Sequence, residues 1–105
     1  YASSESDGAS DVPKRVDLVQ NYPNPFNPST RIRYQISDRT SVRLEVFNAL
    51  GQRVATLVDL SQDAGWYEVN WNGRDATGRA AASGTYFYRI VTETTTRTKS
   101  MVLLR

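Results

Sequence analysis

The carboxylate side chains are the groups of this chain best able to do chemistry. Glu45, Glu68 and Asp75 could supply a pair for hydrolysis, because a positioned carboxylate can donate or accept a proton in a transition state. The chain has no cysteine and no histidine, which removes Cys/His zinc sites, Cys–His nucleophiles and Ser–His–Asp triads. Nothing in so small a domain indicates a cleft in which two carboxylates would face a substrate. We therefore expect a protein that is not an enzyme and has no small-molecule substrate.

Oxygen ligands for calcium are the second kind of chemistry that the residue types allow. Asp75 with Asn72, or Asp59 with Asp63, could contribute such ligands. No stretch has the regular acidic spacing of a calcium loop. Turns in which Asn or Asp side chains bond the backbone explain Asn72 and Asp75 equally well, so we predict no metal site and no cofactor.

Length and charge define the class of protein in which these groups occur. The chain has 105 residues, which fits one domain of the usual ~100–150 residues. Thirteen Lys and Arg residues oppose eleven Asp and Glu residues, so the net charge is +2. The charges alternate rather than cluster, which argues against a nucleic-acid partner. No apolar run approaches the ~20 residues of a membrane-spanning helix, no signal peptide is recognisable, and the first residue is Tyr1, so we interpret the chain as a piece of a longer protein.

The composition divides the chain into two parts. Residues 1–15 are rich in Ser, Ala and acidic residues and offer little to bury, which is typical of a flexible linker. Apolar residues begin to recur at Val16. We predict a linker to an upstream cargo over residues 1–15 and one domain over residues 16–105.

Within the domain, apolar residues alternate with polar ones, which indicates strands with one buried face. Ile32, Tyr34 and Ile36 form one such series, and Val42, Leu44 and Val46 form another. Turn residues separate the series every eight to twelve residues or so, and Gly51 is expected to take a positive φ in one hairpin. This pattern predicts an all-β, immunoglobulin-like antiparallel β-sandwich of about seven strands. The strands are expected near residues 17–20, 30–37, 41–48, 52–60, 65–72, 84–93 and 97–104.

A segment containing three prolines, residues 20–28 (QNYPNPFNP), interrupts this alternation. Proline donates no hydrogen bond to a ladder, so the segment cannot lie in the middle of a sheet. We predict that it runs along an edge or crosses between the sheets, with Tyr22 and Phe26 closing the end of the core. The asparagine side chains are expected to bond the backbone groups that the prolines leave unpaired.

Several strings in this chain occur together and in order in one known family. The chain closely resembles the type A carboxy-terminal sorting domain of the type IX secretion system of the Bacteroidetes and their relatives, from about Leu18 to Arg105. Two positions depart from the family pattern, since Asn72 replaces the more common Asp after Trp and Arg105 replaces a frequent terminal lysine. The matching strings are Leu18–Thr30 (LVQNYPNPFNPST), Ile32–Tyr34 (IRY), Phe47–Val54 (FNALGQRV), Leu57–Val58, Ala64–Gly73 (AGWYEVNWNG), Ala82–Arg89 (ASGTYFYR) and Lys99–Arg105 (KSMVLLR).

The resemblance implies a function that the residue pattern does not show by itself. Such domains are the export address of an N-terminal cargo protein, which is exported to the periplasm and then reaches the outer membrane, the cell surface or the medium. The implied partners are the outer-membrane translocon, its shuttle protein and a sortase-like cysteine protease that often removes the domain. A more distant likeness to the immunoglobulin-like domain of the flagellar hook-capping protein supports the sandwich and says little about its role.

The same resemblance supplies candidate recognition residues. A final strand can present an edge to a partner, which could add a strand beside it or read charged ends at Lys99 and Arg105. The alternative is that the apolar residues of this strand complete the sandwich, and that Tyr86 makes a corner hydrogen bond to the backbone. The candidates are Pro23, Asn24, Pro25, Gly84, Tyr86, Lys99, Met101, Leu103, Leu104 and Arg105.

Two other functions remain open at this point. A carbohydrate-binding module would need a row of exposed aromatic rings. The alternation places Tyr67 and Trp71 on the core face and leaves Trp66 exposed, which is a poor platform alone. A spacer module of a secreted enzyme would need only a folded sandwich.

Overall fold

The computed structural model describes residues 15–105, and most of the predicted linker lies outside this range. The described chain forms seven β-strands and no helix. Within residues 15–105 there is accordingly no helix long and apolar enough to cross a membrane. The strands are β1 (Val16–Leu18), β2 (Thr30–Ile36), β3 (Thr40–Asn48), β4 (Arg53–Gln62), β5 (Gly65–Trp71), β6 (Gly84–Val91) and β7 (Thr96–Leu103).

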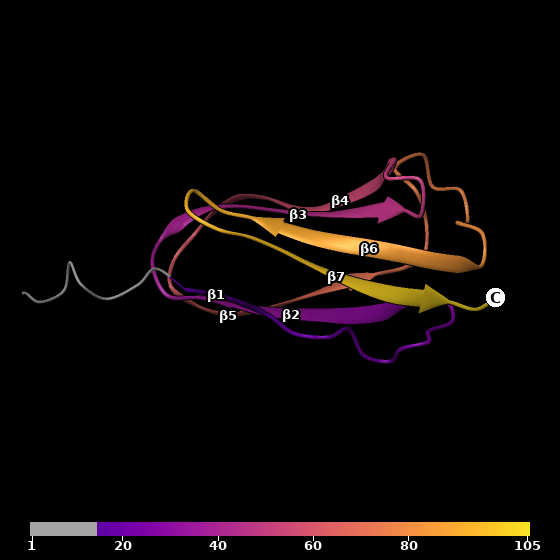
Figure 1. Cartoon of the computed structure of the whole chain (residues 1–105), viewed down its shortest axis with the longest axis horizontal. Coiled ribbons are helices and arrows are strands. Elements are labelled where there is room, and N and C mark those ends of the chain that lie inside the picture. Colours follow the sequence, from indigo (N-terminus) through magenta and orange to yellow (C-terminus); the bar gives the residue numbers. More distant parts are fainter. Residues whose placement is uncertain (1–14) are drawn as a thin grey trace, which may run out of the picture.

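Two antiparallel sheets form the layers of a sandwich (Figure 1). Sheet A has three strands in the order β1-β2-β5, and sheet B has four in the order β4-β3-β6-β7. The predicted all-β sandwich is confirmed, and each of the seven expected strands lies within a few residues of an observed one.

The core is made by the alternate residues that the sequence pattern places on the inner faces. Trp71 packs edge-on against Tyr86 at 5.4 Å between ring centroids. The outward positions of β2 and β3 carry exposed arginines, as expected for strands with one solvated face. The buried apolar residues are Val16, Leu18, Phe26, Ile32, Tyr34, Ile36, Val42, Leu44, Val46, Ala55, Val58, Trp71, Tyr86, Tyr88, Ile90, Met101 and Leu103.

The hairpin between β3 and β4 follows the predicted turn chemistry. Asn48 Oδ1 accepts hydrogen bonds from the backbone N–H groups of Leu50 and Gln52, each at 3.0 Å. Gly51 has a φ of 83°, which an L side chain rarely adopts. This local geometry fixes which residues of β3 face the core.

Candidate functional site

The segment containing three prolines, residues 20–28, links the two sheets at one end of the sandwich. Tyr22 exchanges two backbone hydrogen bonds with Arg31 of β2, at 3.0 and 2.9 Å. Four residues later, Phe26 is buried against Trp71, with ring centroids 5.6 Å apart. The predicted crossing between sheets is confirmed, but the expectation that Tyr22 closes the core is wrong, because its side chain is 70% exposed. The backbone bonds to Arg31 hold Tyr22 on the outer surface of sheet A, so only Phe26 reaches the interior.

Phe26 and Asn24 cover part of the free edge of β7. Phe26 N–H donates to the Val102 carbonyl at 2.9 Å, and the Phe26 carbonyl accepts from Leu104 N–H at 3.0 Å. Asn24 Oδ1 accepts the N–H of Val102 at 3.0 Å. The C-terminal half of β7, around Val102, therefore has hydrogen-bond partners on both sides, with β6 on one side and Asn24 and Phe26 on the other. The bond to Asn24 is of the kind expected for asparagines that bond backbone groups.

A buried polar network anchors this segment to the centre of sheet B. The Tyr88 hydroxyl donates to the Val19 carbonyl at 2.7 Å and accepts from Asn21 N–H at 2.8 Å. Asn21 Nδ2 donates to the Pro23 carbonyl at 3.1 Å and to Thr30 Oγ1 at 3.0 Å. Burial raises the pKa of Tyr88 to about 12, against a smaller lowering by the hydrogen bond from Asn21.

Sequence reasoning predicts one bond of this network, because the asparagines of residues 20–28 are expected to bond backbone groups beside the prolines, as Asn21 does with the Pro23 carbonyl. It does not predict that the Tyr88 hydroxyl and the Thr30 hydroxyl complete the network. One signal could have found the network, since a buried tyrosine hydroxyl normally has a hydrogen-bond partner. The backbone beside the prolines is the nearest supply of unpaired groups.

The N-terminal half of β7, around Thr96 and Thr98, has no hydrogen-bonded strand on its outer side among residues 15–105. Because Val102 O and Leu104 N point away from β6, the alternation of an antiparallel strand points the backbone groups of Thr98 and Thr96 the same way. The side chain of Gln20 donates to the Ser100 carbonyl at 2.8 Å. Ser100 is thus the last residue, going from Leu103 toward Thr96, whose outward backbone group has a partner. Within residues 15–105 no strand is hydrogen-bonded to Thr96 and Thr98 on this side, although β1 of sheet A packs close to β7. Their outward N–H and C=O groups therefore have no ladder partner in this part of the chain, and a partner strand would enter beside β1.

Two basic residues lie on the inward face of this free half. Met101 and Leu103 are buried, so Lys99 and Arg97 occupy the same face of β7 by alternation. Lys99 is half-buried and Arg97 is exposed. Charged side chains on the inward face of an edge strand discourage unspecific pairing with other chains.

The other edge of sheet B is irregular. β4 has two register shifts against β3, between Leu44 and Glu45 and between Val46 and Phe47. In addition, Ala76 N–H donates to the Val54 carbonyl at 3.0 Å and occupies part of this edge. Bulges twist an edge away from flat pairing, so β7 offers the more regular free edge.

Arg105 folds back onto the domain rather than projecting from it. Its Nε donates to the Ala81 carbonyl and its Nη2 to the Gly73 carbonyl, both at 2.5 Å. Its backbone N–H donates to Ser83 Oγ at 2.8 Å. The guanidinium thus joins the end of the described chain to the loop that precedes β6, which makes part of its role structural.

Gly84 and Tyr86 have the structural roles that their residue types suggested. The Tyr86 hydroxyl donates to the Ala82 carbonyl at 2.6 Å, which is the predicted corner bond. Gly84 opens β6 with a φ of 154°, and it pairs with Leu103 across the ladder. Both residues lie beside β7, and neither offers a functional group to a partner.

The candidate recognition residues fall into two groups. Met101, Leu103 and Tyr86 are buried and hold the core. Pro23, Asn24, Pro25, Gly84, Leu104 and Arg105 are on the surface at the same end of the sandwich, while Lys99 lies further along β7. Leu104 is 54% exposed and is the one large apolar candidate that the fold leaves in solvent.

The carboxylates considered for catalysis or calcium binding are not brought together. Glu45 is buried on the outer face of sheet B, 3.2 Å from Arg53 and 3.9 Å from Arg89. Glu68 lies on the outer face of sheet A. Asp75 accepts three hydrogen bonds from Thr77 and Arg79. Among residues 15–105, no group of three or more acidic side chains could hold a metal ion.

Asp75 has the turn geometry that was predicted for it. The hydroxyl of Thr77 is the main cause that lowers the pKa of Asp75, followed by the backbone N–H of Arg79. Asn72 Oδ1 accepts from the backbone N–H of Arg74 at 3.0 Å in the same loop. Both side chains bond the backbone, which accounts for their presence without a ligand.

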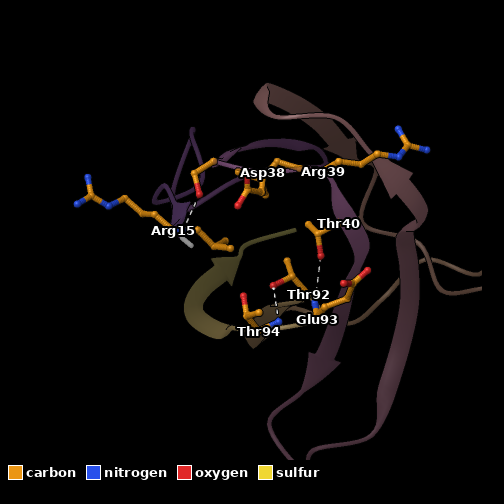
Figure 2. Close-up of a pocket in the computed structure, with 10 residues that line it drawn as sticks. Arg15, Asp38, Arg39, Thr40, Thr92, Glu93 and Thr94 are labelled. Atoms are coloured by element: carbon orange, nitrogen blue, oxygen red, sulfur yellow. Dashed lines mark hydrogen bonds between the residues drawn. The ribbon is translucent and has the colours of Figure 1, made fainter. Parts of the chain in front are cut away.

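A small cavity lies at the opposite end of the sandwich, beside the start of the described chain (Figure 2). Its volume is about 20 Å³, which is room for about one water molecule. Figure 2 shows Arg15 and Arg39 extending away from it, and Thr40 Oγ1 accepting the Glu93 N–H at 3.2 Å. A cavity of this size does not accommodate an organic substrate.

The fold and the corner bond of Tyr86 define an immunoglobulin-like β-sandwich, and comparison with known families agrees. Residues 27–96 match the model of the FlgD Ig-like domain. Since this match spans more than half of the 105-residue chain, the chain belongs to the FlgD Ig-like domain family. Comparison with curated proteins gives no significant match.

Solved structures with the same fold include proteins much longer than this chain. Dimeric latent PorU from Porphyromonas gingivalis aligns with a TM-score of 0.70 and 20% identity, over 89% of this chain and 10% of PorU. PorZ, an essential surface component of the type IX secretion system of the same organism, aligns with a TM-score of 0.57 and 20% identity, over 95% of this chain and 13% of PorZ. FlgD from P. aeruginosa aligns with a TM-score of 0.60 and 22% identity, over 90% of this chain and 74% of FlgD. At these identities the likeness shows the fold alone.

Proposed function

We propose that this domain is a non-catalytic sorting domain that directs a fused cargo protein across the outer membrane through the type IX secretion system. The matching strings from Leu18 to Arg105 support this function, as does the occurrence of the same fold in PorU and PorZ. The outer-membrane translocon and its shuttle are the proposed partners, and a sortase-like protease acts on the junction with the cargo. The protein passes through the periplasm and ends at the cell surface or in the medium.

The observation that carries this proposal is the free edge of β7. Thr96 and Thr98 offer outward backbone groups that no residue between 15 and 105 bonds. A partner can add a strand there by β-augmentation, in which main-chain bonds give affinity and side chains give specificity. Since Arg97 and Lys99 lie beside this edge, we expect the added strand to carry acidic residues.

Point variants test strand addition at the β7 edge better than truncation of the chain does. Removing residues 99–105 would delete Met101 and Leu103, which are fully buried, so the loss of export and the loss of the fold would coincide. Thr98→Pro removes an outward N–H without breaking a bond to β6, because Thr98 N–H points away from that strand. Proline is tolerated at such edge positions and blocks strand addition.

Asn70→Pro is the matched control on the edge strand of sheet A. Arg31 directs its backbone bonds toward Tyr22, so the paired residue Asn70 directs its N–H away from β2 and toward solvent. The two variants therefore place the same residue at equivalent edge positions of different sheets. Circular dichroism and thermal unfolding establish that both remain folded.

The experiment measures surface delivery of a fluorescent reporter that carries a periplasmic signal peptide and residues 1–105, in a bacterium with a type IX system. The wild-type domain and Asn70→Pro are expected to deliver the reporter, and Thr98→Pro is expected to leave it in the periplasm. Export of both variants would refute the role of the β7 edge and leave the sorting function standing. A wild-type fusion that stays in the periplasm, in cells that export their own cargo, would refute the sorting function.

A spacer module is the second candidate, and the FlgD Ig-like match favours it. A spacer needs only the folded sandwich, so it predicts that the wild-type fusion remains in the periplasm. It also predicts that Thr98→Pro has no effect on the function of the intact parent protein. The reporter experiment therefore distinguishes the two functions directly.

A further inference from the structure

The outer face of sheet A carries polar and aromatic side chains that the core and the β7 edge do not use. The face spans three strands, and Tyr22 continues the line of β1 beside β2. Its side chains form three rows across the strands. The rows are Tyr22, Arg31 and Asn70; Val19, Arg33 and Glu68; and Asp17, Gln35 and Trp66.

Two aromatic rings are exposed at opposite corners of this array. Tyr22 is 70% exposed and Trp66 is 51% exposed. Four residues along β2 and two strand spacings separate their positions, which gives a diagonal of roughly 16 Å from ordinary strand dimensions. The backbone bonds between Tyr22 and Arg31 fix the first ring at its corner. Trp66 was expected from the alternation to be exposed, and Tyr22 supplies the second ring that a binding platform needs.

Charged side chains occupy the centre of the face. The Arg33 guanidinium lies over the Trp66 ring at 4.9 Å from the centroid and 4.0 Å from Glu68. The side chain of Arg31 makes no hydrogen bond or ion pair with any residue between 15 and 105. An open groove of about 360 Å³ lies between these groups and is lined by Val19, Gln20, Tyr22, Arg31, Arg33 and Glu68.

We infer that this face binds an acidic oligosaccharide. The inference goes beyond the sorting function and does not depend on it. Aromatic rings provide flat apolar surfaces on which sugar rings stack, and guanidinium groups bind carboxylates through two parallel hydrogen bonds. The groove contains two arginines and one carboxylate, and since Glu68 lies 4.0 Å from Arg33, Arg31 is the guanidinium left for an anionic ligand.

The pattern of the face favours a saccharide over a protein partner. Protein interfaces have an apolar centre from which charges are depleted. Here the centre is the Arg33–Glu68 pair, and the two aromatic rings lie apart at the corners. Amide and carboxylate groups between the rings supply donors and acceptors for hydroxyl groups. The separation of the rings indicates an oligosaccharide rather than a single sugar.

In this arrangement each side chain has a defined task. One sugar ring stacks on Tyr22 in the groove, and its carboxylate meets the free guanidinium of Arg31. Glu68 bonds hydroxyl groups of the same unit, and Gln20, whose Nε2 already donates to Asn21 Oδ1 and the Ser100 carbonyl, accepts one through its Oε1. The saccharide then runs diagonally across Arg33 toward Trp66, and a later sugar ring contacts the part of the Trp66 ring that Arg33 leaves uncovered.

The test uses the full 105-residue chain and affinity electrophoresis in gels that contain alginate or polygalacturonate, with laminarin as the neutral polysaccharide. The acidic gels are expected to retard the wild-type chain, and laminarin is not. Loss of one charge-assisted hydrogen bond weakens binding about tenfold or more, which is the expected effect of Arg31→Gln. Trp66→Ala and Tyr22→Ala are expected to weaken binding to a similar degree.

Matched variants on the outer face of sheet B control for charge and for folding. Arg43→Gln removes an exposed arginine and Phe87→Ala removes an exposed ring, and neither is expected to change retardation. A wild-type titration with a short acidic oligosaccharide is expected to change tryptophan fluorescence through Trp66. The inference is overturned if no acidic polysaccharide retards the chain, if laminarin retards it equally, or if the variants of the two sheets weaken binding alike. Binding only to a protein partner on this face would also overturn it.

Discussion

Replacing Tyr88 with phenylalanine tests the network that holds the proline-containing segment against sheet B. The change removes one oxygen atom from a fully buried ring and leaves its packing intact. It deprives the Val19 carbonyl and the Asn21 N–H of their shared partner, at 2.7 and 2.8 Å in the native protein. Phenylalanine offers no replacement for either bond.

The magnitude follows from the burial of the two orphaned groups. A buried polar group that loses its partner costs about 1–3 kcal/mol. Asn21 is buried and bears the full cost, whereas Val19 is half-buried and its carbonyl gains water in part. We therefore expect the free energy of unfolding to fall by about 2–3 kcal/mol. For a domain of this size, that corresponds to a fall in Tm of roughly 10–20 °C.

Urea and thermal unfolding followed by circular dichroism measure this difference. Tyr67→Phe is the matched control, because the Tyr67 hydroxyl bonds the Asp63 carbonyl in an exposed setting at 2.6 Å. Water replaces that bond, so a change below about 0.5 kcal/mol is expected. A Tyr88→Phe variant within about 0.5 kcal/mol of the wild type would refute the assignment of this network as a structural anchor.

Three further predictions concern the loop packing, the pH dependence and a buried charge. Gly73 has a φ of 72°, and an added Cβ would meet the Pro28 carbonyl oxygen at 2.5 Å. Gly73→Ala is therefore expected to lower the free energy of unfolding by about 2 kcal/mol or more, against about 1 kcal/mol for Gly51→Ala, whose Cβ meets nothing within 4 Å. Thermal melts in which Gly51→Ala is the more destabilised variant would contradict the packing argument. Burial raises the pKa of Tyr88 from 10.0 to about 12, so on raising the pH the hydroxyl loses its proton in the unfolded state first. The stability that this group contributes is complete below about pH 10 and is lost as the pH rises toward about 12. Urea unfolding across this range should show a smaller loss of stability with pH in Tyr88→Phe than in the wild type. Glu45→Gln removes the buried carboxylate that lies beside Arg53 and Arg89. Water reaches most of the Arg53 side chain, whereas the Arg89 Nε is buried without a hydrogen-bond partner among residues 15–105, so we expect a loss of about 1–2 kcal/mol, below the cost of breaking a fully buried pair. Unchanged urea midpoints would show that the pair is neutral.

Most of the fold was predictable because alternation and turn chemistry act locally. The period-two series containing Tyr34 and Leu44 identified the buried faces, and the asparagine and glycine residues near Gly51 identified a hairpin. One buried face fixes the register of a strand, because a slip by one residue would expose its whole apolar set. The corner bond of Tyr86 followed from the same reasoning.

The candidate site was predictable only as a set of sequence positions. Tyr22 and Phe26 look equivalent in the sequence, yet Phe26 enters the core and Tyr22 lies in solvent. The sequence offered Arg105 as a charged end for a partner to read, and the structure directs its guanidinium to two carbonyl groups of a distant loop. Both outcomes depend on where the sheet edges and loops lie in space, which local periodicity does not encode.

The sequence by itself determined that the chain is a β-sandwich, which positions alternate inward, and which family motifs it carries. The tertiary structure alone decided that the segment of three prolines covers half of the β7 edge and that Thr96 and Thr98 have no outer ladder partner among residues 15–105. It alone also placed Tyr22 and Trp66 on one face, with Arg31, whose side chain has no partner among residues 15–105, next to Tyr22. The reason is that these features join residues from different strands and loops, so they exist only once long-range pairing has set which edges meet and which face solvent.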